Sequence, residues 1–577
     1  MAATVQGWPT TMSPRALHPG RVHSVTDDLA ALSVEYHDFR QRISPTGAHM
    51  QGDYRFADRF EDLSRAAEDA EIAEGRRFAG RALAIAEDGL GAQDVISRDM
   101  IAWDAAARAD IAESRLEEFG ASPIFGPQAM LPVEIPKLSM PSAEVAEAMT
   151  GKFHGIAALF RSTADRHREG LARSRTPAEF ATRQTIAQLD AWLSAPLETD
   201  PLLDLSEPVG IADRDAWLAG LRTVVGTEIR PAMTAFRNLL RDEILPAARP
   251  DEQCGLTWLP DGDEAYARMV RFYTTLPLSP AEIHEIGLGQ VASLADEYRA
   301  LGPQVTGSAD LIRIFDALRD DPALHHTNGA DVVSASKTAL AKAKAAMGGW
   351  FGILPTADCE VESTSNGGLA YYFPPARDGT RSGVFFMNTS EPTDWGRFQI
   401  EATAYHEGIP GHHLQLAIAG ELEDVPEFRK TAFIAAYGEG WGLYTERLAD
   451  EMGLYGSALD RMGMLAADSM RACRLVVDTG MHAFGWSRRK AIDYMTENSP
   501  MRASHVESEI DRYAVAPGQA LAYMIGRLEI QRIRAYAEAR LGSRFDIRAF
   551  HDTVLGSGLM PLPTLDRLVR DWVAANA

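Results

Sequence analysis

The sequence predicts a mainly α-helical fold with one small β-hairpin or sheet beside a metal-binding helix. Apolar residues recur at helical spacing along most of the chain. Runs of β-branched and aromatic residues with turn signals are confined to the stretch 351–390. A dense group of histidines and carboxylates comes directly after that stretch. The chain of 577 residues is too long for one small core, so we expect a large protein with more than one lobe.

The composition argues against several classes of function. The formal net charge of −24 disfavours a nucleic-acid partner, because phosphate binding requires clustered Lys and Arg. Three cysteines, far apart in sequence, form no disulfide framework and fit a reducing compartment. The N-terminus has no basic segment followed by an apolar run, and no apolar run reaches the roughly 18 residues of a membrane span. We therefore expect a soluble, cytoplasmic protein with no membrane partner.

The chain divides in order into a loose N-terminal arm (1–24), a helical scaffold lobe (25–250) and a lobe that carries the chemistry (251–577). The arm contains prolines and shows no periodicity. The scaffold lobe consists of amphipathic segments between turn clusters, and we find no chemical motif in it. Its predicted helices run from 25 to a break at 44, then over 60–91, 94–118, 142–169, 176–196 and 211–247.

The third segment begins with predicted helices at 263–274, 279–302, 308–318 and 331–349. Strands are then expected at 359–364 and 383–388, and the Asp-Gly pair at 378–379 predicts a hairpin between 371–373 and 384–386. Such a hairpin beside a metal helix either pairs with an extended substrate or is only a structural ribbon. The end of the chain, 526–576, is predicted to form amphipathic scaffold helices.

The residues 406–413, His-Glu-Gly-Ile-Pro-Gly-His-His, have the composition of a metal site. The zinc-hydrolase pattern His-Glu-x-x-His places two histidines one helical turn apart, with the glutamate as general base. Here His406 and Glu407 supply the first half of that pattern. Pro410 occupies the position of the second histidine.

Two later histidines, His412 and His413, are the candidates for the missing ligand. In a regular helix His412 would point about 120° away from His406, and His413 would lie about 10 Å along the axis. A bulge at 409–411 would return His412 to His406, because proline removes a backbone donor and glycine permits unusual dihedrals. We favour His412, with His413 turned towards substrate or towards a neighbouring ligand, but the spacing leaves both open.

A hydrolytic zinc site needs a third protein ligand, and Glu439 on a following helix is the candidate. Glycines at 438, 440 and 442 surround it, so helices can pack closely there. Glu446 lies two turns further on the same face and is suited to orient a ligand histidine. The alternative is that both carboxylates lie on a solvated helix face.

Polar groups further along the chain are candidates for the reaction itself. A tyrosine near a metal commonly stabilises an oxyanion, and Tyr513 and Tyr523 both qualify, although either can be a core residue. Arg474, Asp478 and His482 are spaced four apart and share a helix face. That face either lines a cleft or forms an intrahelical salt bridge.

Together these motifs resemble the bacterial family labelled domain of unknown function 885. The resemblance extends from about residue 25 to the end and is carried by the stretches 371–379, 406–415, 438–446, 477–486 and 509–521. That family is similar to the helical zinc peptidases of the thimet-oligopeptidase-like and angiotensin-converting-enzyme-like groups. The similarity implies a large helical metallopeptidase fold with a deep cleft.

The resemblance also implies roles for individual residues. Matching of motifs makes His412 and Glu439 ligands and Glu407 the base. The carboxylate often found four residues after the ligand glutamate is Leu443 here, which leaves Glu446 as the substitute.

The resulting hypothesis is a zinc-dependent peptidase with one Zn²⁺ ion per chain, bound by His406, His412 and Glu439. It would trim short peptides from a chain end, as a carboxypeptidase or dipeptidase does. Glu407 would take a proton from water and return it to the leaving amine. The oxyanion would be stabilised by the residues Tyr523, Tyr513 and His482.

Substrate binding is assigned to the hairpin and to nearby cations. Tyr372 on the hairpin and His413 would contact the peptide, and Arg377, Arg381 or Arg512 would bind a terminal carboxylate. Two other functions remain open: a zinc amidohydrolase acting on a non-peptide amide, and a non-enzymatic binding protein with a degraded site. We expect a monomer or homodimer.

Overall fold

The computed structural model describes residues 24–577 except 366, 377–378 and 380. Helices dominate the described residues, and their strands form a three-stranded sheet, which confirms the predicted mainly α-helical class. The predicted loose arm lies outside the described residues except for Ser24. The Ser24 side chain accepts a hydrogen bond from the Asp27 backbone and so caps the first helix, where the sequence predicts one to begin.

The first half of the described chain is helical, as predicted. The helix expected over 60–91 begins only at Arg65, because the side chain of Ser64 accepts a hydrogen bond from the Ala67 backbone and caps it. The helices are α1 (Val25–Ile43), α2 (Pro45–Met50), α3 (Arg65–Ala84), α4 (Ala92–Glu113), α5 (Pro127–Glu134), α6 (Ala143–Ala172), α7 (Glu179–Ser194), α8 (Arg214–Val224) and α9 (Arg230–Leu239). Short π-helical segments continue α8 and α9 over most of the predicted 211–247 helix.

The second half contains the sheet and the helices around it. Its elements are α10 (Gly262–Thr274), α11 (Pro280–Val305), α12 (Leu311–Asp320), α13 (Gly329–Ala346), β1 (Cys359–Thr364), β2 (Ala370–Phe373), β3 (Gly383–Asn388), α14 (Gln399–Glu407), α15 (His412–Gly420), α16 (Glu427–Thr431), α17 (Ala435–Glu451), α18 (Ala458–His482), α19 (Arg488–Asn498), α20 (Ala503–Val515), α21 (Ala522–Leu541), α22 (Ile547–Leu555) and α23 (Leu562–Asn576).

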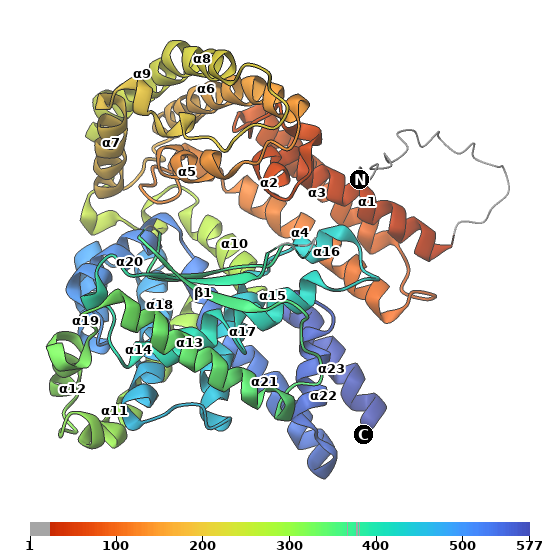
Figure 1. Cartoon of the computed structure of the whole chain (residues 1–577), viewed down its shortest axis with the longest axis vertical. Helices are drawn as coiled ribbons and strands as arrows, with labels where there is room; N and C mark the ends of the chain where they lie inside the picture. Colours follow the sequence, from red (N-terminus) through yellow and green to blue (C-terminus); the bar gives the residue numbers. More distant parts are fainter. Residues whose placement is uncertain (1–23, 366, 377–378, 380) are drawn as a thin grey trace, which may run out of the picture.

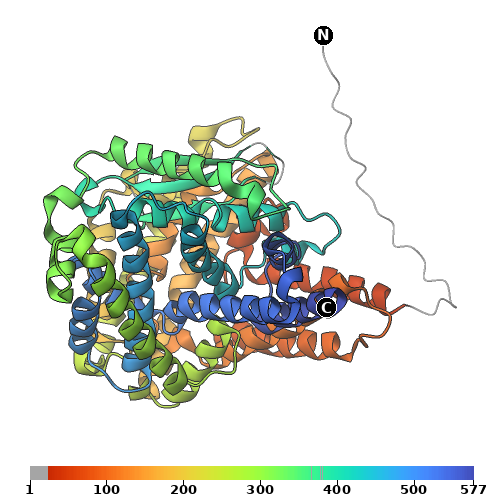
Figure 2. The ribbon, with the colours of Figure 1, turned by 90° about the horizontal axis from the view of Figure 1, so that it is seen from below.

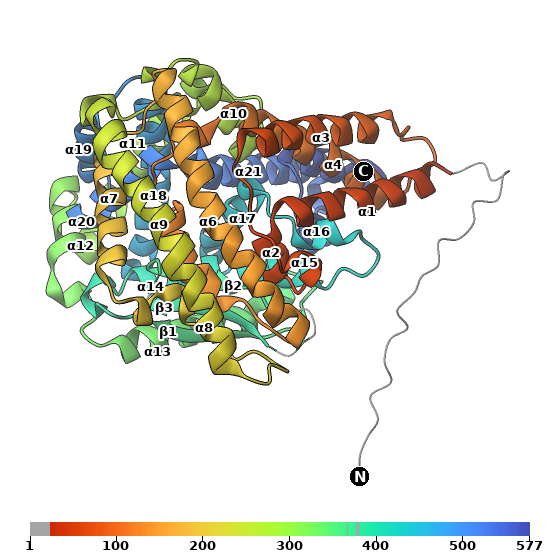
Figure 3. The same ribbon diagram turned by 90° about the horizontal axis from the view of Figure 1, so that it is seen from above.

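The hydrophobic cores do not follow the lobe boundary predicted near residue 250. Helices α5–α9 lie together at the top of Figure 1 and share a core of their own, and Figure 3 shows α6, α7 and α9 side by side. Helices α1, α3 and α4 instead contribute to the core formed by α13–α17 and α21–α23. Arg429 on α16 also donates hydrogen bonds to Gln93 on α4. The first helices of the chain therefore support the segment that carries the histidines.

The sheet has the strand order β1-β3-β2, with β3 parallel to β1 and antiparallel to β2. The predicted pairing of 371–373 with 384–386 is confirmed, with Tyr371 opposite Phe386. Asp378 of the predicted turn lies outside the described residues. Helix α13 runs along the sheet and packs against β1 (Figure 2). Strand β3 lies between the other two, so β2 is an edge strand on the side away from β1. The sheet therefore presents one strand edge near the histidine-bearing helices.

Helix α17 packs closely on α21 beside the predicted third ligand. A Cβ atom on Gly526 would lie 1.9 Å from the carbonyl oxygen of Ala436, and one on Gly440 would lie 2.5 Å from Gly526. The glycines around residue 439 thus permit the close helix packing that the sequence predicts.

Candidate metal centre

The helix that begins at Gln399 ends at Glu407, and a new helix begins at His412. The sequence predicts a bulge within one helix, whereas the structure has a break between α14 and α15. The chain turns over 408–411, where the Ile409–Pro410 peptide bond is cis and the His413 amide donates to the carbonyl of Gly408 at 3.1 Å. A Cβ atom on Gly411 would lie 1.9 Å from the carbonyl oxygen of His406, so only glycine fits where the turn passes α14.

The break brings His412, and not His413, next to His406. The two imidazole rings lie 4.8 Å apart between centroids at 85°. Glu439 on α17 completes the group, with its Oε2 atom 3.6 Å from His406 Nε2 and 3.3 Å from His412 Nε2. Of the described residues, these three form the one group of His, Cys, Asp or Glu whose potential ligand atoms all lie within 4.8 Å of one another.

This geometry fits a tetrahedral zinc ion. When nitrogen and oxygen ligands lie about 2.0–2.1 Å from such an ion, neighbouring ligand atoms are about 3.3 Å apart. The two histidine–glutamate separations of 3.6 and 3.3 Å are close to that value. Two imidazoles and a carboxylate also form a ligand set used by hydrolytic zinc sites. The residues present can therefore hold the ion that the sequence predicts.

His406 is held firmly from two sides. Its Nδ1 atom lies 2.8 Å from Oε1 of Glu446, a side chain that is 1% exposed. This hydrogen bond turns the Nε2 atom towards Glu439, which is the orienting role predicted for Glu446. A Cβ atom on Gly442 would lie 2.7 Å from the His406 ring, so the ring packs directly against the α17 backbone.

The electrostatics of the cluster favour an added positive charge. Burial alone would lower the pKa of His406, but its contacts with Glu439 and Glu446 outweigh burial and raise the pKa to about 9. Burial would raise the pKa of Glu439, but the two histidines hold that pKa far below its usual range. Without a bound metal ion, these contacts favour the positively charged imidazolium form of His406, and a metal ion would take the place of its second ring proton.

The cluster borders a cavity of about 800 Å³. Glu407 and Tyr523 line the same cavity, as the sequence predicts for residues that act on a substrate. The Tyr523 ring is stacked near the His406 ring, with centroids 6.4 Å apart and planes at 21°. Tyr372 lines the cavity from β2. One cavity thus brings together the predicted ligands, the base, one tyrosine and the strand edge.

Two predicted oxyanion stabilisers are not brought into this cavity. His482 is fully buried; its Nδ1 atom accepts from the Leu256 amide at 3.1 Å, and its Nε2 atom donates to the Tyr513 carbonyl at 3.0 Å. Burial lowers the pKa of His482 to about 4. The Tyr513 hydroxyl accepts from Arg474 at 2.6 Å and donates to Glu509. The predictions for His482 and Tyr513 are corrected, because their polar atoms join helices to one another.

The predicted substrate contacts also divide. His413 accepts from the Tyr372 hydroxyl at 2.9 Å and donates to the Ala357 carbonyl at 3.1 Å, so it positions β2 and does not line the cavity. Arg381 is exposed, donates to the carbonyls of Pro374 and Ser382, and lies outside the cavity lining. Both predictions are corrected on this geometry. Arg377 lies outside the described residues.

Arg512 lines the cavity, but its guanidinium is already engaged by Glu509 at 2.8 Å and by Gln519 at 2.6 Å. Arg471 and Arg474 on α18 also line the cavity, and neither was predicted as a substrate-binding residue. Asp478 faces Tyr266 and Gly518, away from this wall. Of the α18 face formed by Arg474, Asp478 and His482, only Arg474 therefore lines the cavity.

The fold and the site define a helical protein with a two-histidine, one-glutamate cluster on the wall of a cavity. The chain belongs to the family described as "Bacterial protein of unknown function (DUF885)", whose model matches residues 45–569. Comparison with curated proteins gives no match. None of the described helices combines the length and apolar character needed to cross a membrane.

Two solved structures show the same fold. One is a "putative lipoprotein" from Colwellia psychrerythraea, with 25% identity and a TM-score of 0.87 over 96% of this chain and all of that one (100%). The other is a "putative lipoprotein of unknown function" from Shewanella oneidensis, with 18% identity and a TM-score of 0.76 over 94% of this chain and 99% of that one. The second likeness concerns the fold alone.

Proposed function

We propose that the protein is a zinc-dependent peptidase that hydrolyses short peptides, with one zinc ion per chain on His406, His412 and Glu439. The observation that carries this proposal is the mutual geometry of these three side chains beside Glu407 and a cavity. A zinc ion bound there supplies Lewis acidity, which polarises a carbonyl group and lowers the pKa of water. A relation to the helical zinc peptidases is part of the proposal.

Glu407 is the general base in this proposal. It follows His406 directly at the end of α14 and lines the cavity. Its carboxylate takes a proton from the attacking water and returns it to the leaving amine.

Tyr523 is the remaining candidate for stabilising the oxyanion, since Tyr513 and His482 lie outside the cavity. Burial raises the pKa of the Tyr523 hydroxyl above its usual value, which keeps the hydroxyl protonated at neutral pH. A protonated hydroxyl can donate a hydrogen bond to the oxygen that becomes negative in the transition state. The centroid of its ring lies 6.4 Å from that of the proposed ligand His406, which supports this role.

The edge strand β2 offers a surface for an extended peptide. One side of β2 pairs with β3, and residues of β2, including Tyr372, line the cavity. A peptide backbone can add to such an edge through main-chain hydrogen bonds. A cavity of about 800 Å³ suits a short peptide rather than a folded protein.

The test is incubation of the zinc-loaded protein with a mixed peptide library, followed by mass spectrometry. The proposal predicts that short peptides are trimmed, that Glu407→Gln abolishes trimming while retaining zinc, and that Glu439→Gln loses both. An intact library with zinc-loaded protein would overturn the peptidase assignment. Hydrolysis only of non-peptide amides would support the amidohydrolase alternative, and near-zero zinc content would leave a binding protein.

We also propose that the protein is cytoplasmic, as the sequence predicts. The composition favours the cytoplasm, whereas the two similar structures carry lipoprotein descriptions. Fractionation of cells that express the full-length protein distinguishes the two, because a lipoprotein is recovered with membranes and a cytoplasmic protein with the soluble fraction.

A further inference from the structure

Two arginines on α18, Arg471 and Arg474, contact the ring of Tyr523, and that ring also lies beside the proposed ligand His406. The guanidinium carbons of Arg474 and Arg471 are 4.6 and 5.8 Å from the centroid of the Tyr523 ring. The Tyr523 ring in turn lies beside the His406 ring. Both arginines line the cavity. A group bound to these arginines would therefore lie close to the reacting amide of a substrate.

The donors of Arg471 are poorly used. Among the described residues its one hydrogen bond runs from Nη1 to the Ala467 carbonyl at 3.3 Å. Its Nη2 atom is 3.8 Å from Glu446, beyond hydrogen-bonding distance, and its buried Nε atom has no partner among the described residues. A guanidinium has five N–H donors, so most of those on Arg471 are left over.

Arg474 is more deeply buried and also keeps an unused donor. It is 5% exposed; its Nε donates to Tyr513 at 2.6 Å and its Nη2 to Glu509 at 2.8 Å. Its Nη1 atom is buried with no hydrogen-bond partner in the described part of the chain. An unpaired donor on a buried cation costs free energy unless a ligand satisfies it.

The charges on this wall do not balance. Glu509 is the carboxylate shared by Arg474 and Arg512, each at 2.8 Å. The carboxylate nearest to Arg471, that of Glu446, is already hydrogen-bonded to His406. The wall therefore carries surplus positive charge in a protein whose formal net charge is −24. Planar guanidinium groups bind carboxylates with matched geometry.

We propose that Arg471 and Arg474 bind a carboxylate of the substrate next to the scissile amide, so that the preferred substrates are anionic short peptides. This inference rests on the proposed function and assigns the carboxylate to Arg471 and Arg474 in place of Arg381 and Arg512. The carboxylate belongs either to the peptide C-terminus or to an acidic side chain, since both present the same group to the arginines.

The test measures binding without turnover, by calorimetry on zinc-loaded protein that carries Glu407→Gln. One pair of probes is N-acetyl-alanyl-alanine and its C-terminal amide. A second pair is N-acetyl-alanyl-glutamic acid amide and the corresponding glutamine amide. We expect that in one of the two pairs the acid binds roughly 10- to 100-fold more tightly than its uncharged amide, because its carboxylate forms charged hydrogen bonds with the arginines. The pair that shows the difference identifies the source of the carboxylate.

Substitution of Arg471 isolates the role of the pair, because few contacts hold that side chain. Arg471→Gln should bring the affinity ratio of acid to amide close to unity, and Arg471→Lys should restore part of it. Arg461→Gln is the matched control, since Arg461 lies on the same helix, is exposed and pairs with Asp450. Arg474→Gln is a second variant whose folding is checked first, because that side chain is buried.

The outcomes separate this inference from the proposed function. Equal binding of both members in both probe pairs would overturn the inference even if the wild-type protein hydrolyses peptides. A preference that persists unchanged in Arg471→Gln and in folded Arg474→Gln would also overturn it, because neither arginine would then be binding the carboxylate. A preference lost in Arg471→Gln, in a protein that trims no peptide, would keep the carboxylate site and reject the peptidase assignment.

Discussion

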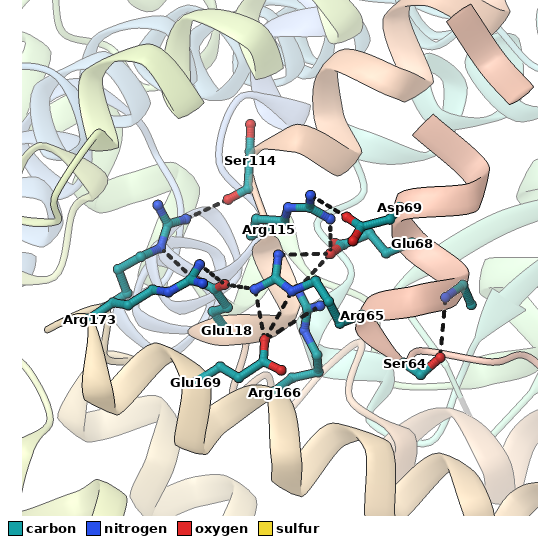
Figure 4. A network of polar contacts seen from close by, with 12 residues as sticks. Ser64, Arg65, Glu68, Asp69, Ser114, Arg115, Glu118, Arg166, Glu169 and Arg173 are labelled. Atoms are coloured by element: carbon teal, nitrogen blue, oxygen red, sulfur yellow. Dashed lines mark hydrogen bonds and ion pairs between the residues drawn. The ribbon is translucent and has the colours of Figure 1, made fainter. Parts of the chain in front are cut away.

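Two buried clusters of charged residues in this molecule are neutralised in different ways. In the first, Glu118 is buried between Arg65, Arg173 and Arg175. The neighbouring carboxylate of Glu68 pairs in turn with Arg115 and with Arg166 on α6 (Figure 4). In the second, the ion pairs that Glu439 forms among the described residues are with the histidines His406 and His412. The first cluster is neutralised by the arginines of the chain, whereas the second lacks such a partner.

This difference separates a structural cluster from a functional one. Arginines that surround a carboxylate fix helices relative to one another and leave little room for a further cation. At the proposed metal site, the arginine nearest to a carboxylate is Arg471, 3.8 Å from Glu446. Positive charge at that site has to come from a proton on histidine or from a bound metal ion.

Asp478 shows a third way to accommodate a buried carboxyl group. It is fully buried and accepts hydrogen bonds from the Tyr266 hydroxyl at 2.5 Å and from the Gly518 amide at 3.1 Å. Burial raises the pKa of Asp478 to about 7, against these hydrogen bonds and the charge of Arg512. A proton therefore neutralises this carboxyl group below neutral pH.

The largest expected effect is on zinc content and distinguishes adjacent histidines. His412→Gln should reduce bound zinc from about one ion per chain to below about 0.1, because a protein ligand is lost. His413→Gln is the matched control and should retain zinc, since His413 contacts Tyr372 and Ala357. Metal analysis of protein purified without chelators measures both, and loss of zinc in the His413 variant alone would reverse the assignment.

The second prediction concerns the base. Glu407→Gln should lower kcat by roughly 100- to 10,000-fold, the contribution of general base catalysis. Zinc content should stay unchanged, because Glu407 is not one of the three ligands. Peptide turnover and metal content are measured on the same sample. Full activity with bound zinc would show that Glu407 takes no part in the reaction.

The third prediction concerns the arginine-bound cluster. Glu118→Gln should lower the free energy of unfolding by about 3–5 kcal/mol, because it leaves buried guanidinium charge uncompensated. Zinc content should be unaffected. Urea unfolding monitored by circular dichroism gives the stability of the variant. If instead zinc is lost while the fold is as stable as before, the distinction between the two clusters fails.

The last prediction concerns the pH dependence of stability due to Asp478. Its pKa is about 7 in the folded protein and 3.8 in the reference state, so the folded protein holds the proton more tightly. Its contribution to stability is present below about pH 4 and is lost as the pH rises to 7, at up to about 1.4 kcal/mol per pH unit. Asp478→Asn should remove this dependence. Urea unfolding between pH 4 and 7 gives the free energy of unfolding of both proteins. An equal fall of this free energy with pH in the wild-type protein and in Asp478→Asn would contradict the prediction.

Local sequence signals predicted the elements that depend on neighbouring residues. Helical periodicity predicted the helices, and the Asp-Gly pair predicted the antiparallel pairing of β2 with β3. The Pro410-Gly411 step indicated a distortion that moves His412 towards His406. It could not tell a bulge from a helix break, because that depends on the fit of Gly411 against the His406 carbonyl oxygen.

Features that depend on distant partners were not predictable in this way. Helical spacing predicts that His482 lies on the same helix face as Arg474. It does not predict that the Leu256 amide donates a hydrogen bond to the Nδ1 atom of His482. The pairing of Glu118 with three arginines likewise joins residues far apart in sequence. The shared core of the first helices with α21–α23 also arises only when the chain folds back on itself.

The most direct test of the central claim is a crystal structure of protein purified without chelators, with diffraction data collected on both sides of the zinc absorption edge. We predict an anomalous peak about 2.0–2.2 Å from a nitrogen atom of His406, a nitrogen atom of His412 and an oxygen atom of Glu439. A zinc-replete crystal without a peak at this position would contradict the account, as would a peak bound by His413 in place of His412.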